Sequence, residues 1–277
     1  MPTIASLLLL GLTGASGLSV PMSMRVAQQT PRSILHRVGR ISLGWGPDPV
    51  WTKLPVGSIR DASQGLKAVT IEPPAETAAG YTTPGQYVQL REVGAEKASP
   101  MAVASAPGAA GSFEFLIKEQ PPSDWSAGTG WLTNAAAGLE LEMSQVMGGG
   151  FKSVGDAPSV ILFAVGSGIS PIRSVIESGV LKGKDVTLYY GAQTAAQMAY
   201  QDKFGEWAAL GVECVPVLSK PDASWGGATG YVQDVARAKG VAADCAMLIC
   251  GMKGMAEGVK ALAADSGIAE DKVIANF

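Results

Sequence analysis

The stretch SVILFAVGSGISPIRSVIESG, residues 159–179, decides the fold. An apolar run leads into GSGISP and then into an amphipathic segment, the pattern of a strand, a tight turn and a helix. Gly166 and Gly168 let the backbone turn and approach a pyrophosphate without an intervening Cβ. Ser170 is predicted to cap the helix and Pro171 to occupy its first turn. Because proline replaces the third glycine of the common fingerprint, the motif alone is also compatible with an ordinary tight turn.

The alternation of strand and helix continues from this stretch to the C-terminus. Five apolar runs, SVILFAV, DVTLYYG, VECVPVLS, CAMLICG and KVIANF, alternate with four amphipathic segments. This rhythm predicts a doubly wound, parallel, five-stranded α/β sheet over residues 152–277. Ligands of such sheets bind at the carboxyl ends of the strands, where GSGISP and the Cys250–Gly251 pair are expected. Taken alone, Cys250 is more simply a small buried hydrophobe.

Residues 46–151 have a different rhythm. Short apolar or alternating runs are separated there by glycine and proline: WTKLPVGSIR, LKAVTIEP, QYVQLRE, MAVASA, SFEFLIK and LELEMSQV. This spacing predicts an antiparallel β-barrel or sandwich. The segment FKSVGDA, residues 151–157, is expected to link the two halves.

Composition removes several classes of chemistry. The chain has 277 residues, of which 47% are hydrophobic, enough to bury a sizeable core. His36 is its one histidine and lies in residues 1–45, which are predicted below to be a cleaved leader, so the mature chain would have no histidine for a Ser-His-Asp triad, a general base or a metal site. Cys214, Cys245 and Cys250 lack the CxxC pairing of zinc or iron–sulfur sites, and no metal is expected. Hydride transfer between organic cofactors, which needs little side-chain acid–base chemistry, is favoured by elimination.

Charge argues against nucleic acid as a partner. Four of the 21 basic residues lie in residues 1–47, which contain no acid, so the remainder carries 17 basic against 24 acidic residues. An acidic excess of this size does not suit a phosphate backbone.

Residues 1–45 are predicted to be a targeting leader. IASLLLLGL followed by GASG is the pattern of a secretory h-region and cleavage zone. The run is too short to span a bilayer, and no transmembrane segment is expected in the mature chain. The following segment contains serine and arginine but no acid, as organelle transit peptides do. The pair resembles the bipartite leaders of algae with complex plastids and predicts a plastid location; the alternative is a plain signal peptide and the secretory pathway.

Five motifs together resemble the nucleotide-binding domain of the ferredoxin–NADP reductase superfamily. They are GSGISPIRS, LYYGAQ, LSKPDASWGGATGYV, CGMKGM and the terminal ANF, in that order within residues 158–277. TTPGQYVQLR, SFEFLIKE and LEMSQVMGGGF are similar to the flavin-domain barrel of the same superfamily. Within it, the chain looks closest to the short plastid-targeted plant and algal FAD/NAD(P)-binding oxidoreductases called fruit proteins. The resemblance implies a flavin-domain-like barrel followed by an NAD(P)-binding α/β domain.

The resemblance assigns residues to the pyrophosphate and the nicotinamide of the dinucleotide. Cys250 and Gly251 would flank the nicotinamide, with Met252 standing where the family has proline. Phe277 matches a C-terminal aromatic that covers the flavin ring in many relatives, although an aromatic can instead simply finish a strand. Cys250 and Phe277 are therefore the candidate catalytic residues. The pyrophosphate would bind to Gly166, Ser167, Gly168, Ile169, Ser170 and Pro171.

The adenosine end of the dinucleotide favours NADP slightly over NAD. Ser219 and Lys220 align with a Ser-Arg pair, and Tyr231 with a tyrosine, that hold the 2′-phosphate in NADP-using relatives. Lysine meets a phosphate as a point charge but lacks the bidentate fork of arginine. Relatives selective for NADH carry similar segments, and Gln193 is compatible with either ribose.

The chain departs from the superfamily at the flavin motif. Relatives hold FAD with Arg-x-Tyr-Ser on a barrel strand, whereas SPMAVAS places Ser99, Met101 and Ala102 at those three positions. FAD as a cofactor thus rests on the resemblance alone. Lys97 is a possible substitute cation, with a solvated surface charge as its default reading. The remaining residues assigned to the flavin side are Val103, Ser105 and Thr129, the last of which is otherwise an ordinary helix cap.

These observations predict an oxidoreductase that moves electrons from NAD(P)H through FAD to an unknown acceptor. Such chemistry depends on positioning two rings and needs no histidine. The alternative is a non-catalytic or flavin-less dinucleotide-binding subunit or sensor of a plastid complex that keeps the reductase fold. A third hypothesis is a reductase that takes flavin as a transient substrate. Nothing in the sequence names the acceptor.

Overall fold

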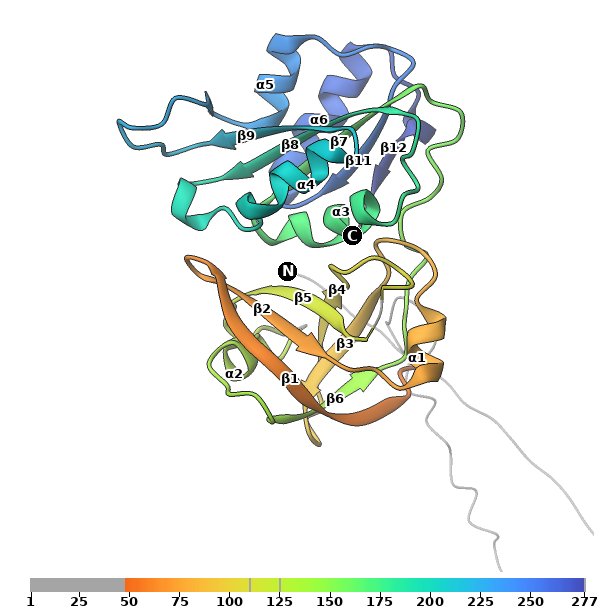
Figure 1. The fold of residues 1–277 in the computed structure, drawn as a ribbon, viewed down its shortest axis with the longest axis vertical. Helices are drawn as coiled ribbons and strands as arrows, with labels where there is room; N and C mark the ends of the chain where they lie inside the picture. The colour runs from red at the N-terminus through yellow and green to blue at the C-terminus, as the bar shows by residue number, and fades with distance from the viewer. Residues whose placement is uncertain (1–47, 110, 125, 277) are drawn as a thin grey trace, which may run out of the picture. The chain divides into compact units, whose positions relative to one another are not determined.

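The computed structural model describes residues 48–109, 111–124 and 126–276, and the two sheets in these residues belong to one compact unit (Figure 1). The predictions for the leader, residues 1–45, and for Phe277 lie outside the described residues. The domain limits set at residues 45 and 151 remain predictions.

The N-terminal half is a six-stranded antiparallel sheet that curls into a barrel-like form (Figure 1). All six apolar runs named above contribute a strand, and the order across the sheet is β4-β3-β6-β1-β2-β5. The two outer strands approach each other, because Ala104 donates its backbone N–H to the Glu114 carbonyl. The elements are β1 (Trp51–Ser63), β2 (Leu66–Ile71), α1 (Ala75–Gly80), β3 (Tyr87–Glu92), β4 (Ser99–Ala102), β5 (Phe113–Lys118), α2 (Gly130–Thr133) and β6 (Glu140–Ser144).

The C-terminal half is a parallel sheet with helices on both faces (Figure 1). The order β10-β9-β8-β7-β11-β12 places β7, which leads into GSGISP, between β8 and β11. The strands are β7 (Ser159–Val165), β8 (Asp185–Ala192), β9 (Val212–Leu218), β10 (Ala228–Thr229), β11 (Ala246–Cys250) and β12 (Val273–Ala275). The helices are α3 (Ile169–Glu177), α4 (Phe204–Ala209), α5 (Val232–Lys239) and α6 (Lys253–Asp265), with short 3₁₀ turns η1 (Gly166–Gly168), η2 (Ala195–Gln197), η3 (Gln201–Lys203) and η4 (Glu270–Lys272).

Two details of the parallel half differ from the sequence prediction. The five expected strands are present, and the two-residue β10 adds a sixth beside the end of β9. The amphipathic segment 194–211 forms a helix only over Phe204–Ala209. Tyr200 explains the second difference, because its φ of 60° is left-handed and interrupts a right-handed helix.

Alternating side chains of the parallel strands build two separate cores. Leu162 and Tyr190 pack with α3 residues on one face, whereas Phe163 and Tyr189 pack with α5 and α6 residues on the other. This period of two follows from the pleat of a strand. The first core also takes in Leu66 and Leu116 of the barrel, so apolar burial joins the two halves.

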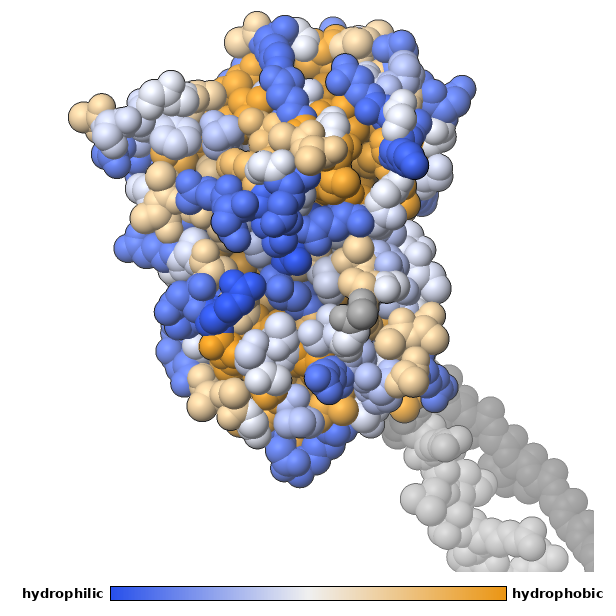
Figure 2. All heavy atoms as spheres, in the orientation of Figure 1, coloured by the Kyte–Doolittle hydropathy of each residue, from blue (hydrophilic) through white to orange (hydrophobic). Residues whose placement is uncertain are grey.

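The surface is mixed in character. Figure 2 shows hydrophilic side chains gathered where this face passes from one half to the other, with apolar side chains more evident over the α/β half. Among the described residues, no helix combines the length and the apolarity that a membrane crossing requires. Nor do any three His, Cys, Asp or Glu side chains of that part of the chain converge in a way suited to a metal ion.

Candidate functional site

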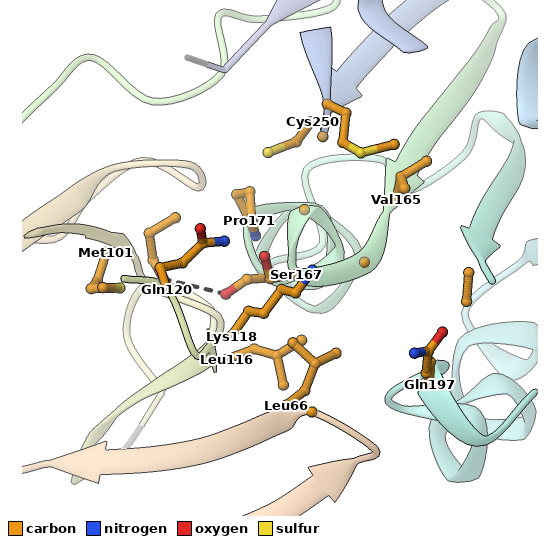
Figure 3. Close-up of a pocket in the computed structure, with 18 of the residues that line it drawn as sticks. Leu66, Met101, Leu116, Lys118, Gln120, Val165, Ser167, Pro171, Gln197 and Cys250 are labelled. Carbon is orange, nitrogen blue, oxygen red and sulfur yellow. Dashed lines mark hydrogen bonds between the residues drawn. The ribbon is translucent and has the colours of Figure 1, made fainter. Parts of the chain in front are cut away.

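A cavity of about 560 Å³ lies where the carboxyl edge of the parallel sheet faces β4 and β5 of the barrel (Figure 3). Its size is that of a small-molecule or cofactor site. The α/β half lines it with Val165, Gly166, Ser167, Gly168, Ser170, Pro171, Ala192, Gln193, Gln197, Cys250, Gly251, Met252 and Asn276. The barrel lines it with Gln64, Gly65, Leu66, Pro100, Met101, Ala102, Leu116, Lys118 and Gln120.

The two glycines of GSGISP have different structural roles. Gly166 has a φ of +57°, which favours glycine, and a Cβ built on it meets no atom within 4 Å. Gly168 is closed in, because its Cβ would lie 2.3 Å from the Cys250 carbonyl oxygen. Gly168 therefore lets the loop pack against the end of β11, and Gly166 leaves its side of the loop open.

The start of α3 corrects the prediction for Ser170. The 3₁₀ turn over Gly166–Gly168 runs directly into the helix, so Gly168 occupies the cap position and Ser170 lies inside the first turn. The Ser170 hydroxyl instead donates to the Ala102 carbonyl of β4 at 3.3 Å. Pro171 lies in the first turn, as predicted. The first N–H groups of a helical run lack intrahelical acceptors, and here the run begins with the 3₁₀ turn, because the Ile169 N–H already bonds the carbonyls of Gly166 and Ser167. The turn over Gly166–Gly168 therefore offers donors and a positive dipole end to an anion.

Ile169 belongs to the loop in sequence but not to the cavity. Its side chain is fully buried in the core beneath α3. Its backbone N–H already bonds the carbonyls of Gly166 and Ser167, so the structure leaves Ile169 no free donor for a dinucleotide.

Cys250, Gly251 and Met252 line the cavity at the end of β11. Burial raises the pKa of the Cys250 thiol to about 12, so the group is a neutral thiol at physiological pH and not a thiolate nucleophile. Its Sγ contacts the Asn276 carbonyl oxygen at 3.7 Å. Met252 is largely exposed at the rim.

Asn276 ties the end of the chain to the barrel. Its backbone N–H donates to the Ile249 carbonyl, and its side-chain amide donates to the Gly85 carbonyl at 2.9 Å. These two bonds fix the last described residue at the cavity wall. No sequence pattern marks Asn276 as a site residue, because a lone asparagine has no distinctive signal.

The residues predicted for the adenosine end lie beside the cavity and not in its lining. Ser219 and Lys220 follow β9, and their backbone N–H groups donate to the carbonyls of Ala192 and Gln193. Since Ala192 and Gln193 line the cavity, these bonds place Ser219 and Lys220 next to it along the carboxyl edge. Tyr231, 63% exposed, precedes α5 at the same edge.

The residues predicted for the flavin side divide into two groups. Met101 and Ala102 line the cavity. Val103 is fully buried in the barrel core. Ser105 is also buried, its hydroxyl accepting from the Glu114 N–H and its carbonyl accepting from the Tyr81 hydroxyl.

Ser99 stands at the arginine position of the superfamily motif, and its hydroxyl is already hydrogen-bonded to other groups of the protein. Its hydroxyl is buried, donates to the Gly128 carbonyl at 2.8 Å and lies 2.6 Å from the Ser126 hydroxyl. Lys97 donates to the Ser123 carbonyl at 2.9 Å. Side chains of the β4 edge thus hold the loop that precedes α2.

The Thr129 hydroxyl is likewise already hydrogen-bonded within the protein. The residue holds the cap position of α2, but its hydroxyl makes no capping bond and instead donates to the Lys118 carbonyl at 2.6 Å. The same hydroxyl accepts from the Gln120 N–H at 2.8 Å. Only 4% of Thr129 is exposed, so the structure does not bring it to the cavity.

Lys118 is the one charged side chain among the described residues that line the cavity. Figure 3 shows it extending from the end of β5 toward Ser167 of the phosphate loop. Gln120 follows it on the same wall, and Gln64 and Gly65 come from the β1–β2 turn. No sequence pattern marks Lys118, Gln120 or Gln64, since an exposed polar residue at a strand end looks the same with or without a site.

Buried polar contacts attach α3 to the barrel. Arg173 of α3 donates to Glu114 of β5 and also to Glu177, and its guanidinium carbon lies 4.7 Å from the centre of the Tyr200 ring. Burial alone lowers the pKa of Arg173, but the hydrogen bond to Glu177 and the charges of its neighbours outweigh it, so the pKa lies above its usual value. The helix that carries the phosphate loop is therefore held by a charged group from each half.

A scan against family models and a search of known proteins give a consistent result. The family model described as oxidoreductase NAD-binding domain matches residues 162–261. The chain is 32% identical over 246 residues to the fruit protein pKIWI502 of Actinidia deliciosa, covering 81% of this chain and 76% of that protein. It is 29% identical over 157 residues to CDP-6-deoxy-L-threo-D-glycero-4-hexulose-3-dehydrase reductase of Yersinia pestis, of which it spans only 44%.

Solved structures share the fold. A ferredoxin NADP⁺ reductase from Neisseria gonorrhoeae, solved with bound FAD and NADP, superposes with a TM-score of 0.71 at 17% identity. The match covers 82% of this chain and 99% of that one. The antiparallel barrel followed by the doubly wound sheet is thus the two-domain fold of that reductase.

Proposed function

Because the chain belongs to the ferredoxin–NADP reductase-like superfamily, we propose that it is an oxidoreductase that takes electrons from NAD(P)H and passes them through a flavin to an acceptor. The observation that carries the proposal is the shared cavity. It brings the phosphate loop and the Cys250 end of the parallel sheet opposite β4 of the barrel. A flavin, when bound, accepts a hydride and can release electrons singly or in pairs.

The α/β half supplies a binding path for the dinucleotide. The turn at Gly166 that leads into α3 suits the pyrophosphate, and Lys118 on the opposite wall extends toward this loop (Figure 3). Cys250 and Gly251 suit the nicotinamide ring. With its pKa raised to about 12, the Cys250 thiol bounds that ring as a neutral, polarizable group and takes no proton from the substrate.

For the dinucleotide, we propose NADPH in preference to NADH. Lys220 is exposed beside the cavity edge, and its backbone is anchored to Gln193. A lysine at this position provides a positive charge for a 2′-phosphate, which NADH lacks. Ser219 and the exposed Tyr231 supply hydroxyls along the same edge.

The test uses the full-length chain and measures binding and turnover separately. We expect calorimetry to detect NADPH binding without added flavin, and we expect NADPH oxidation to require flavin, which either accepts the electrons itself or passes them to an artificial acceptor such as ferricyanide. Absence of NADPH binding would overturn the proposal. NADPH binding without turnover under any flavin or acceptor would instead favour a dinucleotide-binding sensor or subunit.

For location, we propose the plastid. The support is the composition of residues 1–45, an apolar run followed by a serine- and arginine-bearing segment without acids. Fusion of these residues to a fluorescent protein in an alga with complex plastids tests this proposal. Secretion of the fusion would favour the signal-peptide alternative.

A further inference from the structure

The position where the superfamily anchors the FAD diphosphate is closed in this chain by its own hydrogen bonds. The Ser99 hydroxyl is 2% exposed and is engaged with both Ser126 and Gly128. Gly128 has no room for a ligand on its Cα side, because a Cβ there would lie 2.6 Å from the Gln120 carbonyl oxygen. The residues present therefore do not fit a diphosphate at this end of β4.

The helix start beside it does not offer an alternative anchor. Helix α2 has four residues, too short to provide a substantial dipole. The hydroxyl of Thr129 is already donated to the Lys118 carbonyl. The Lys97 ammonium group donates to the Ser123 carbonyl, so it is engaged with the same loop.

The cavity itself carries countercharge for one diphosphate only. Lys118 is the sole charged group in its described lining, and it faces the phosphate loop. A dinucleotide and FAD bound together would bring two diphosphates to this region. The cavity lining offers the second no cation, the exposed Lys97 beside β4 already donates to the Ser123 carbonyl, and α2 is too short to provide a substantial dipole.

The wall at β4 is nevertheless suited to an aromatic ring. Pro100, Met101 and Leu116 line the barrel side of the cavity with apolar atoms. Methionine sulfur makes favourable contacts with aromatic rings. Across the cavity lie Cys250 and Asn276, at the end where the nicotinamide is expected.

Resting on the proposed function, we propose that this chain takes flavin as a diffusible substrate recognised by its isoalloxazine ring alone. Riboflavin, FMN and FAD are then equivalent substrates. A hydride ion moves from C4 of the dihydronicotinamide to N5 of the flavin, and N1 takes a proton from solvent. The products are NAD(P)⁺ and a dihydroflavin, which leaves and carries the electron pair to its acceptor.

The experiment compares the three flavins on the full-length chain. We expect the purified protein to lose added FAD on desalting, and we expect the dissociation constants of riboflavin, FMN and FAD, from quenching of flavin fluorescence, to agree within about threefold. NADPH should reduce all three at comparable rates. FAD that copurifies in stoichiometric amount, or that binds more than about tenfold tighter than riboflavin, overturns the inference while leaving the proposed function intact.

Two variants separate ring recognition from tail recognition. Met101→Ala should weaken all three flavins by the same factor, whereas Ser99→Ala should weaken none of them by more than about twofold. A loss of FAD affinity alone in Ser99→Ala overturns the inference, because it would place the tail at β4. NADPH binding without binding of any flavin also overturns it, and the absence of both defeats the proposed function as well. Thermal unfolding confirms that each variant is folded.

Discussion

Arg173 of helix α3 and Glu114 of strand β5 form an ion pair across the junction between the parallel sheet and the barrel, with their side chains only 9% and 15% exposed. Glu114 also accepts from the Tyr200 hydroxyl at 3.0 Å, and Arg173 donates to Glu177 at 2.9 Å. Because α3 begins at the phosphate loop, this pair sets the distance between the loop and the barrel wall. Apolar residues could hold the halves together, but they would not fix that position with equal directionality.

Removing one partner of this pair should destabilise the protein strongly. Arg173→Met leaves the largely buried Glu114 carboxylate with only the longer, 3.4 Å contact to the exposed Arg60, and we expect the free energy of unfolding to fall by about 3 kcal/mol. The double variant Arg173→Met with Glu114→Gln removes both charges and should be at least ~1 kcal/mol more stable than the sum of the single effects predicts. Urea unfolding of the four proteins measures this coupling. Additive effects would show that the pair does not act as a unit.

The two loop glycines should separate stability from binding. Gly168→Ala places a Cβ against the Cys250 carbonyl, so the end of β11 must move, and we expect a loss of roughly 1–3 kcal/mol in stability together with weaker NADPH binding. Gly166→Ala meets open space and costs only ~1 kcal/mol for its left-handed backbone, yet its methyl group would occupy the open side of the loop where we propose that the pyrophosphate binds. Calorimetric titration and urea unfolding report the two quantities. A Gly166→Ala variant with unchanged NADPH affinity would show that the pyrophosphate binds elsewhere.

Variants of Lys118 and Lys220 should separate binding of the pyrophosphate, which NADPH and NADH share, from binding of the 2′-phosphate, which only NADPH carries. Lys118 faces the loop proposed to bind the pyrophosphate, which NADPH and NADH share, so Lys118→Ala should weaken both by about fivefold, or ~1 kcal/mol. Lys220→Ala should weaken NADPH by a similar factor and leave NADH unchanged. Lys182→Ala, in the turn between α3 and β8 and outside the cavity lining, is the matched control. If Lys220→Ala spares NADPH, the assignment of the adenosine end is wrong.

The residues whose positions the sequence predicted are those that local structure determines, while their binding roles stay predictions. Gly166 and Gly168 are recognisable because a turn between a buried strand and a helix restricts the backbone within a few residues. Met101, Cys250 and Met252 could be placed at the cavity through motif alignment with the superfamily. Their backbone positions follow from strands whose apolar runs are unmistakable.

The residues that the sequence missed depend on the closing of the barrel against the parallel sheet. Lys118 and Gln64 become cavity residues only because β5 and the β1–β2 turn face the other half. Thr129 shows the opposite case, since a threonine before a helix start suggested an available hydroxyl. Its bond to the Lys118 carbonyl, eleven residues away, removes that hydroxyl from solvent. The prediction that Ser170 caps α3 was wrong because a 3₁₀ turn moves the start of the helical region upstream of Ser170.

Stability should fall in alkaline solution through groups that the fold keeps protonated. Burial raises the pKa of Cys250 and of Tyr81 to about 12, and burial followed by the Glu213 charge raises that of Cys214 to about 11. Each contribution is complete below the pKa of the unfolded group and is lost as pH rises toward the folded value. An unfolded thiol titrates near ~8.5, so at pH ~9.5 Cys250 alone should cost about 1 kcal/mol of stability. Urea unfolding under reducing conditions at several pH values from neutral upward measures the decline. Cys250→Ser should show a shallower decline over this range, and an identical slope in the variant would contradict the assignment of the effect to this buried thiol.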